Sequence, residues 1–390
     1  MPDSRNNEGP FISGHVLPLR GAKQDLPTDA ILFWTVRDRS KGADKLTLTI
    51  ENADLRWWDN PIWIKGNTLR VSFGYPSHVS VPRKFKIRKV TGFTRLTVEA
   101  YGRELDFHAK KHVRSFQSMR VDEAVQKLAS ENGFNVTIIQ QIPGVKGRIQ
   151  QTRQTDAQFI QQMADRYGYE WFIRSDSTFV FQERDFDQAP IKVFKWRGLD
   201  AGSEIIGEPK VETSILNKPG RIRVVAQDHK AKRLREASAD NESTPRTALG
   251  DATEVVADDT SSDGRSLGSR ADPKPAEKLD LYAWQDLADM TARARSEYKL
   301  VQSTQVKMTI EVIGDPFLKA KALVLLENFG VLLSGLYYVV EAKHRGGAGY
   351  TTTLKLRRNA MGRVSKKVPK VRAKVNRKRR PDFALKRDIL

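Results

Sequence analysis

Residues 151–181 read QTRQTDAQFIQQMADRYGYEWFIRSDSTFVF, and the hydrophobic period changes within this stretch. Its first half places apolar side chains at helical spacing: Phe159, Ile160, Met163 and Tyr167. Thr155 with Gln158 forms a capping-box pattern, and Gly168 stands where a left-handed C-cap belongs. YEWFI and STFVFQE then alternate around a short polar turn. The stretch therefore predicts a helix, a glycine cap and a β-hairpin.

The segment upstream of this stretch follows the same order. From Ser118 onward the apolar residues keep helical spacing: Val121, Ala124, Val125, Leu128 and Ala129. Gly133 follows as a C-cap, and FNVTII then has the composition of a strand. Because ASENGFNVTII and ADRYGYEWFI can be laid over each other, residues 116–190 are predicted to form an α/β insert domain with a duplicated helix-strand element.

The preceding part of the chain alternates apolar and polar residues with period two, in the segments LTLTI, TLRVSF, KFKIRKV and RLTVEAY. Gly, Asn, Pro and Ser clusters separate these segments, as in antiparallel barrels and sandwiches. Residues 1–115 are therefore predicted to be a first β-barrel domain. Trp57, Trp58 and Trp63 are predicted to fill its core.

Composition divides the remainder of the chain into four ranges. Residues 191–228 are predicted to hold further β strands, and residues 229–279 a polar flexible insertion, because large apolar residues almost vanish there. Residues 280–362 resume with a helix and then four alternating segments, which predict a second β-barrel domain. Residues 363–390 form a basic C-terminal tail, in which Asp382 is the single acid between Arg363 and Arg387. The predicted fold class is mainly β with an α+β insert.

Charge and composition limit the function classes. The net charge is +20, and the chain contains no cysteine, which excludes disulfides and thiolate zinc sites. The sequence lacks a signal-peptide pattern and any long uncharged apolar run, so we expect neither secretion by that route nor stable membrane insertion. Nucleic acid, an acidic protein face or lipid headgroups are the partners that could order the basic tail, and a merely solvated tail is the alternative.

Three segments resemble one known family, the late control protein D group of baseplate hub proteins, related to the hub part of VgrG-type spikes. Residues 44–75 are similar to its opening barrel, with a strand pair, a Gly turn and SFGY. Residues 151–181 are similar to its helix and hairpin, and residues 332–360 to its closing L-S-G-x-Y-Y-V strand, Gly turn and final strand. The polar insertion and the basic tail depart from the family pattern.

The resemblance implies a structural role without bond chemistry. It implies a homotrimer whose paired barrels form a pseudo-sixfold ring, with a tail tube protein above, a separate trimeric spike protein below, and other baseplate proteins around it. It also implies assembly in the bacterial host cytoplasm and a final location in the virion tail baseplate. A VgrG-like hub of a bacterial injection system is the first alternative. A basic nucleic-acid-binding protein is the alternative of another class.

Residue patterns for catalysis or metal binding are weak. His108 and His112 have helical i,i+4 spacing, but the general base of a metalloprotease is missing after the first. The carboxylates of Glu99, Glu104 and Asp106 could serve a peptidoglycan-cleaving site, yet no cleft is implied. Asp185 with Asp187, and the DDTSSDG segment, lack the closing glutamate of a calcium loop. We therefore predict no catalytic, cofactor-binding or metal residues, and a protein that is not an enzyme.

Overall fold

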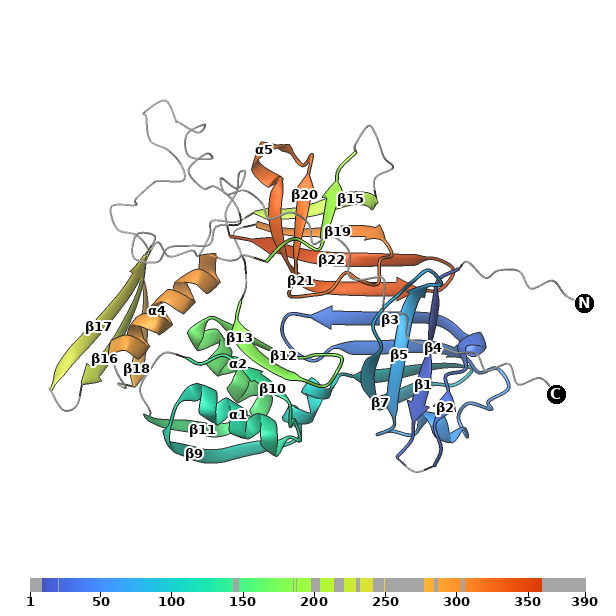
Figure 1. The fold of residues 1–390 in the computed structure, drawn as a ribbon, viewed down its shortest axis with the longest axis horizontal. Helices are drawn as coiled ribbons and strands as arrows, with labels where there is room; N and C mark the ends of the chain where they lie inside the picture. Colours follow the sequence, from blue (N-terminus) through green and yellow to red (C-terminus); the bar gives the residue numbers. More distant parts are fainter. Residues whose placement is uncertain are drawn as a thin grey trace, which may run out of the picture.

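The computed structural model describes residues 9–359, except 20, 143–146, 185, 187, 198–203, 214–220, 229–231, 241–248, 250–276, 284–286 and 303–305. Within this part, two β units lie at opposite ends of one continuous sheet, and an α/β unit lies beside them (Figure 1). The predicted basic tail and most of the predicted polar insertion fall outside the described residues.

The first β unit contains the alternating segments of the N-terminal third. Its strands are β1 (Phe11–Leu17), β2 (Gln24–Asp25), β3 (Ile31–Arg39), β4 (Lys45–Glu51), β5 (Thr68–Tyr75), β6 (His78–Val79), β7 (Arg83–Gly92) and β8 (Arg95–Tyr101). Alternate side chains of these strands point inward and form a core around Leu48, Phe73, Phe85 and Val98. Of the three tryptophans, Trp63 is buried in this core and Trp57 packs against it. Trp58 is 43% exposed, so the prediction for Trp58 was wrong.

The second β unit is built from segments far apart in the sequence. Its strands are β14 (Lys192–Lys195), β15 (Ile205–Thr213), β19 (Val306–Ile313), β20 (Leu323–Glu327), β21 (Gly335–Gly346) and β22 (Tyr350–Arg358), and the short helix α5 (Gly330–Leu333) follows β20. The core of this unit lies around Ile310, Leu326, Tyr337 and Leu354. β15 ends the sheet on this side.

β21 joins the two units. The first half of this strand pairs with β20, through Gly335 to Tyr338, and the second half pairs antiparallel with β3, from Glu341↔Arg39 to Gly346↔Trp34. The strand path therefore runs without a break as β15-β19-β22-β21-β3-β4-β8-β7-β5-β1-β2.

Two closed barrels were predicted, and the described strands form none. Closing the first unit would require β1 or β2 to pair with the edge of β3 that faces away from β4. β21 already pairs with that edge. The two units are instead open, curved parts of one shared sheet.

The α/β unit confirms the predicted helix-glycine-strand repeat. α1 (Val121–Glu131) leads to β10 (Thr137–Ile139), and α2 (Asp156–Tyr167) leads to β12 (Tyr169–Ile173). Both strands pair with β13 (Phe179–Glu183), β10 in parallel and β12 antiparallel, and β9 (Lys111–Met119) pairs with β11 (Gly147–Thr155) beside them. Gly133 and Gly168 follow the helices with φ of 78° and 77°, which only glycine adopts at little cost.

The capping box of α2 is formed as predicted. The Thr155 hydroxyl accepts a hydrogen bond from the backbone N–H of Gln158 at 3.2 Å. The side-chain oxygen of Gln158 accepts one from the backbone N–H of Thr155 at 3.0 Å. Thr155→Ala should therefore lower the free energy of unfolding by about 1 kcal/mol, measured by urea titration. Thr152→Ala, at an exposed position of the same strand, is the matched control and should change it by less than about 0.5 kcal/mol. Equal losses in both variants would contradict the capping role.

A separate three-stranded β sheet corrects part of the predicted polar insertion. Residues Arg233–Asp240 form β17, which pairs with β16 (Arg221–Asp228), and β18 (Glu277–Ala283) pairs with β16 on its other side. α4 (Leu287–Gln302) covers this sheet with Met290, Ala294 and Tyr298. The inward residues of β17 are Ala237 and Ala239, so small side chains rather than large apolar ones form its buried face.

Candidate functional site

The seam where β3 meets β21 holds a buried polar cluster. Asp38 of β3 accepts two hydrogen bonds from the Arg83 guanidinium, both of 3.2 Å. Asp44 lies 3.6 Å from Arg83, and Lys321, from the loop before β20, lies 3.8 Å from Asp38. The ammonium of Lys321 also donates to the Arg39 carbonyl. Two cations therefore neutralise two carboxylates where the units meet.

The protonation of these carboxylates differs. Burial disfavours the ionised form of Asp38, but the charges of Arg83 and Lys321 outweigh burial and lower its pKa. Burial and the nearby Asp38 charge raise the pKa of Asp44 to about 6. A third carboxyl, that of Glu104, belongs to the 3-10 helix Arg103–His108 that follows β8. Burial and the Asp44 charge raise the pKa of Glu104 to about 8. Glu104 is thus mostly protonated at neutral pH, and the cluster holds no excess negative charge.

His344 of β21 closes the inner side of the seam. It is fully buried, and its Nε2 lies 3.0 Å from the Leu318 carbonyl, which can only accept. In the neutral ring Nδ1 is therefore the acceptor, and the hydroxyls of Tyr350 and Thr352 lie 2.9 Å and 3.1 Å from it. Burial, followed by the Arg83 charge, lowers the pKa of His344 to about 3. The lowered pKa keeps the imidazole neutral, and the contacts at both nitrogens make it a structural group.

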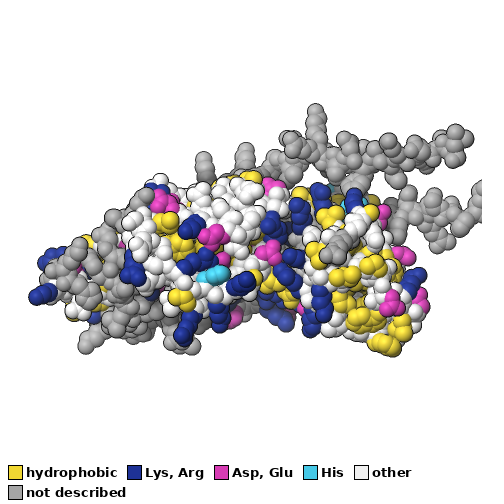
Figure 2. All heavy atoms as spheres, turned by 90° about the horizontal axis from the view of Figure 1, so that it is seen from below, with side chains coloured by type: hydrophobic (Ala, Val, Ile, Leu, Met, Phe, Trp, Pro, Cys, Tyr) yellow, Lys and Arg dark blue, Asp and Glu magenta, His cyan; other side chains and the backbone are white. Residues whose placement is uncertain are grey.

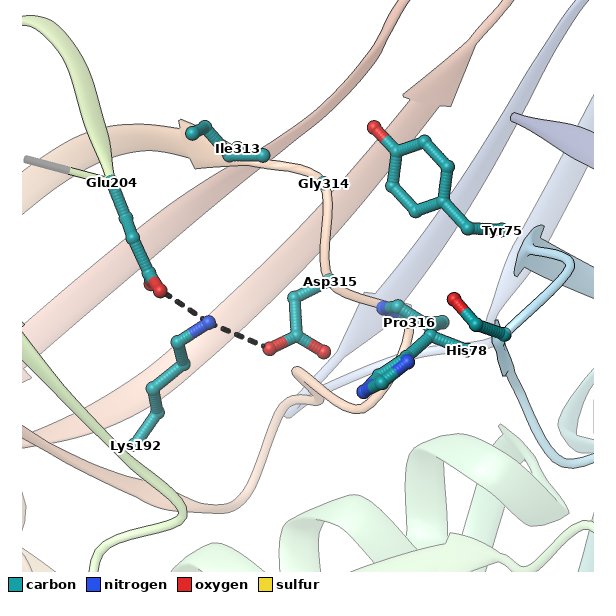
Figure 3. Close-up of a pocket in the computed structure, with 9 residues that line it drawn as sticks. Tyr75, His78, Lys192, Glu204, Ile313, Gly314, Asp315 and Pro316 are labelled. Atoms are coloured by element: carbon teal, nitrogen blue, oxygen red, sulfur yellow. Dashed lines mark hydrogen bonds and ion pairs between the residues drawn. The ribbon is translucent and has the colours of Figure 1, made fainter. Parts of the chain in front are cut away.

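A hollow of 280 Å³ lies where the β5–β6 turn approaches the second unit (Figure 3). Lys192 points into it and contacts Glu204 at 2.7 Å and Asp315 at 2.9 Å. Burial opposes the charge of Lys192, but its hydrogen bonds to both carboxylates prevail and raise its pKa. A lysine held protonated in this way is no nucleophile, and both of its ion pairs lie within the second β unit, where they join β14 to the segments beside β15 and β19.

The residues considered for catalysis or metal binding do not come together. His108 ends a 3-10 helix and His112 lies in β9, so the pair does not share a helical face. Glu99 pairs with Lys45 at 2.8 Å, Asp106 pairs with Arg88 at 2.8 Å, and Glu104 is buried separately. Within the described residues no group of three His, Asp or Glu side chains is arranged to hold a metal. Asp185, Asp187 and the DDTSSDG segment lie outside the described residues.

One end of the first β unit presents an apolar surface. Hydrophobic side chains gather over this unit in the view from below (Figure 2). Leu19, Ile64 and Phe93, which come from three different loops, are 68%, 55% and 64% exposed. Buried Asn67 accepts from the Leu19 N–H at 3.0 Å, and buried Asn52 donates to the Phe93 carbonyl at 2.7 Å. These two asparagines fix the loops, so the exposed groups are held in place before any partner arrives.

Solved structures share the fold of this chain, although comparison of the sequence with family models and with curated proteins gives no match. The tail protein from Neisseria meningitidis MC58 superimposes with a TM-score of 0.63 at 14% identity, over 90% of this chain and 97% of that chain. The 43 kDa tail protein of prophage MuSo2 from Shewanella oneidensis gives 0.62 at 10% identity, over 90% and 98%. The chain has the fold of phage tail proteins.

The same fold extends to bacterial secretion. An E. coli component of the type VI secretion system, described as similar to T4 bacteriophage tail proteins gp27 and gp5, gives a TM-score of 0.51 at 10% identity, over 87% of this chain and 77% of that chain. The resemblance to hub and VgrG-type proteins that the sequence indicates is thus confirmed in the fold. None of the described helices is long and apolar enough to cross a membrane.

Proposed function

We propose that this chain is a structural baseplate hub of a contractile phage tail or a related injection machine. The observation that carries the proposal is the shared fold with two phage tail proteins over nearly their whole length.

The arrangement of the sheet supports a symmetry adaptor. One chain carries two β units joined by the β21–β3 pairing, so three chains would present six such units. A trimer of this kind matches a sixfold tube on one side and a threefold spike on the other. Lys321 of the second unit contacts Asp38 and the Arg39 carbonyl of β3, and this link between the units supports the fixed arrangement that a ring of alternating units requires.

The apolar end of the first β unit offers a docking surface for a neighbouring baseplate protein. Leu19, Ile64 and Phe93 are the anchors that would be buried there. A VgrG-like hub in a bacterial injection machine is the alternative that the type VI secretion match favours. Such a hub would share the fold of the phage hub and would belong to a different machine.

The mass of the full-length protein in solution tests the proposal. Light scattering should give a trimer that persists at high salt, or a 3:3 complex once a candidate spike protein is added. A lasting monomer that ignores both the spike and the tube protein would contradict the hub. Phe93→Asp should weaken co-purification with a neighbouring baseplate protein at least tenfold, whereas Phe317→Asp, at an aromatic position of the second unit that is 44% exposed, should not.

A further inference from the structure

The outward face of the long sheet carries a row of cations that crosses both β units. Lys343 stands directly opposite Arg37, and Arg37 directly opposite Lys45. Tyr101 follows on β8 and Lys86 on β7. Residues directly opposite in an antiparallel sheet share a face, and strands lie about 4.8 Å apart, so the row spans about 19 Å.

This row is only partly neutralised. Glu341 lies 3.6 Å from Arg37, and Glu99 lies 2.8 Å from Lys45. Among the described residues, no acid lies within ion-pairing distance of Lys343, Lys86 or the exposed Arg345, which shares a face and a strand with Lys343. Like charges directly opposite on neighbouring strands destabilise a sheet. A face that keeps them in register is expected where anions bind.

The remaining side chains of this face indicate the class of anion. Apart from Tyr101, Phe33 and the acids Glu51, Glu99 and Glu341, the cations are interspersed with threonines: Thr35, Thr47, Thr49, Thr97, Thr351 and Thr353. Lysine, arginine and threonine are the side chains that contact phosphate oxygens in nucleic-acid complexes. Protein interface cores are instead rich in aromatic residues and poor in lysine. The scarcity of aromatic stacking platforms also disfavours single strands.

We propose that the outward face of β21, β3, β4, β8 and β7 binds the phosphate backbone of duplex DNA without reading its sequence. Regularly spaced cations and hydroxyls on a sheet give phosphate contacts, and no side chain on this face is arranged to enter a groove and read base edges. The inference goes beyond the hub and does not depend on it, because it concerns a polymer that contacts the sheet rather than a baseplate neighbour.

The test measures binding of the full-length chain to a 20-base-pair duplex by fluorescence anisotropy between 50 and 200 mM salt. The face variant is Lys86→Gln, Lys343→Gln and Arg345→Gln. Losing three phosphate contacts should reduce the salt slope by about 2.7, so the loss of affinity across this salt range should shrink about 40-fold. The control variant is Lys23→Gln, Lys65→Gln and Lys110→Gln, three exposed lysines outside the face with the same total charge change. The natural chain and both variants are full-length, so residues 360–390 are the same in all three.

Each outcome decides the proposal. A reduced slope in the face variant with an unchanged slope in the control supports it. An equal reduction in both variants would show that net charge alone attracts DNA, and an unchanged face variant would show that the duplex binds elsewhere. A polyglutamate probe separates the other class of partner: if the face variant loses only polyglutamate binding, the face receives an acidic protein and the DNA proposal is overturned. Melting temperatures of the variants, measured alongside, exclude unfolding as the cause.

Discussion

Replacing Arg83 with methionine should lower the free energy of unfolding by about 3–5 kcal/mol, the largest loss expected for any single charged residue at the seam. Arg83 donates two hydrogen bonds to Asp38 and lies 3.6 Å from Asp44, and all three groups are largely buried. Methionine keeps an apolar stem but removes the guanidinium, so Asp44 loses its contact with Arg83 and Asp38 is left with Lys321 at 3.8 Å. Urea titration of the full chain at pH 7 measures the change.

Arg88→Met provides a matched control on the same strand. Arg88 pairs with Asp106 at 2.8 Å near the surface, where such a pair contributes about 0–1 kcal/mol. Adding Asp38→Asn to Arg83→Met should restore part of the stability, because it removes a buried charge that has lost its partner. Similar losses for Arg83→Met and Arg88→Met would mean that burial of the cluster contributes nothing.

The sequence identifies the elements of this protein better than their assembly. Period-two alternation and the Thr155 capping box locate strands and helix α2 because those signals depend on neighbouring residues alone. Barrel closure depends on which strand pairs with the edge of β3 that faces away from β4. That partner is β21, which lies about 300 residues later in the sequence. Nothing local in either strand specifies the pairing, so two closed barrels were predicted where one shared sheet forms.

The seam residues were missed although strand parity carries a signal for them. Trp34, Val36 and Asp38 alternate along β3, which places Asp38 on the inward face, and His344 follows Ala342 in the same way on β21. A charged or polar residue at an inward position predicts a buried partner. The identity of that partner could not be predicted, because Arg83 and Lys321 come from a different strand and a distant loop.

Net charge was misleading for a different reason. The sequence directs attention to the basic tail, where Lys and Arg are contiguous. The cations of the sheet face are spread over β21, β3, β4 and β7 and become neighbours only through strand pairing. Charge that is dispersed in the sequence can thus be concentrated on a folded surface, and only the register reveals it.

The final prediction concerns pH and Glu104. In the folded protein burial raises the pKa of Glu104 to about 8 from its usual 4.5, and burial raises that of Asp44 to about 6 from 3.8. Both carboxyls therefore bind protons more tightly when the chain is folded. Their stabilising contribution is complete below the unfolded pKa values and is lost as the pH rises through about 6 and then about 8.

Glu104→Gln should remove the Glu104 part of this loss, because glutamine cannot ionise and still offers an oxygen to the Ile173 N–H. Near pH 4.5 the variant and the natural chain should have similar free energies of unfolding. By pH 9 the variant should be more stable by a few kcal/mol, since each unit of pKa difference corresponds to about 1.4 kcal/mol. Urea titrations at pH 4.5, 7 and 9 measure the trend.

Glu99→Gln is the control for this trend. Its hydrogen bond to Lys45 at the surface lowers the pKa of Glu99, the opposite of what burial does to Glu104. Glu99→Gln should therefore give no gain in stability between pH 7 and pH 9. A difference between Glu104→Gln and the natural chain that stays constant from pH 4.5 to 9 would show that Glu104 is already ionised in the folded protein. Three ionised carboxylates of the seam would then face the two cations Arg83 and Lys321.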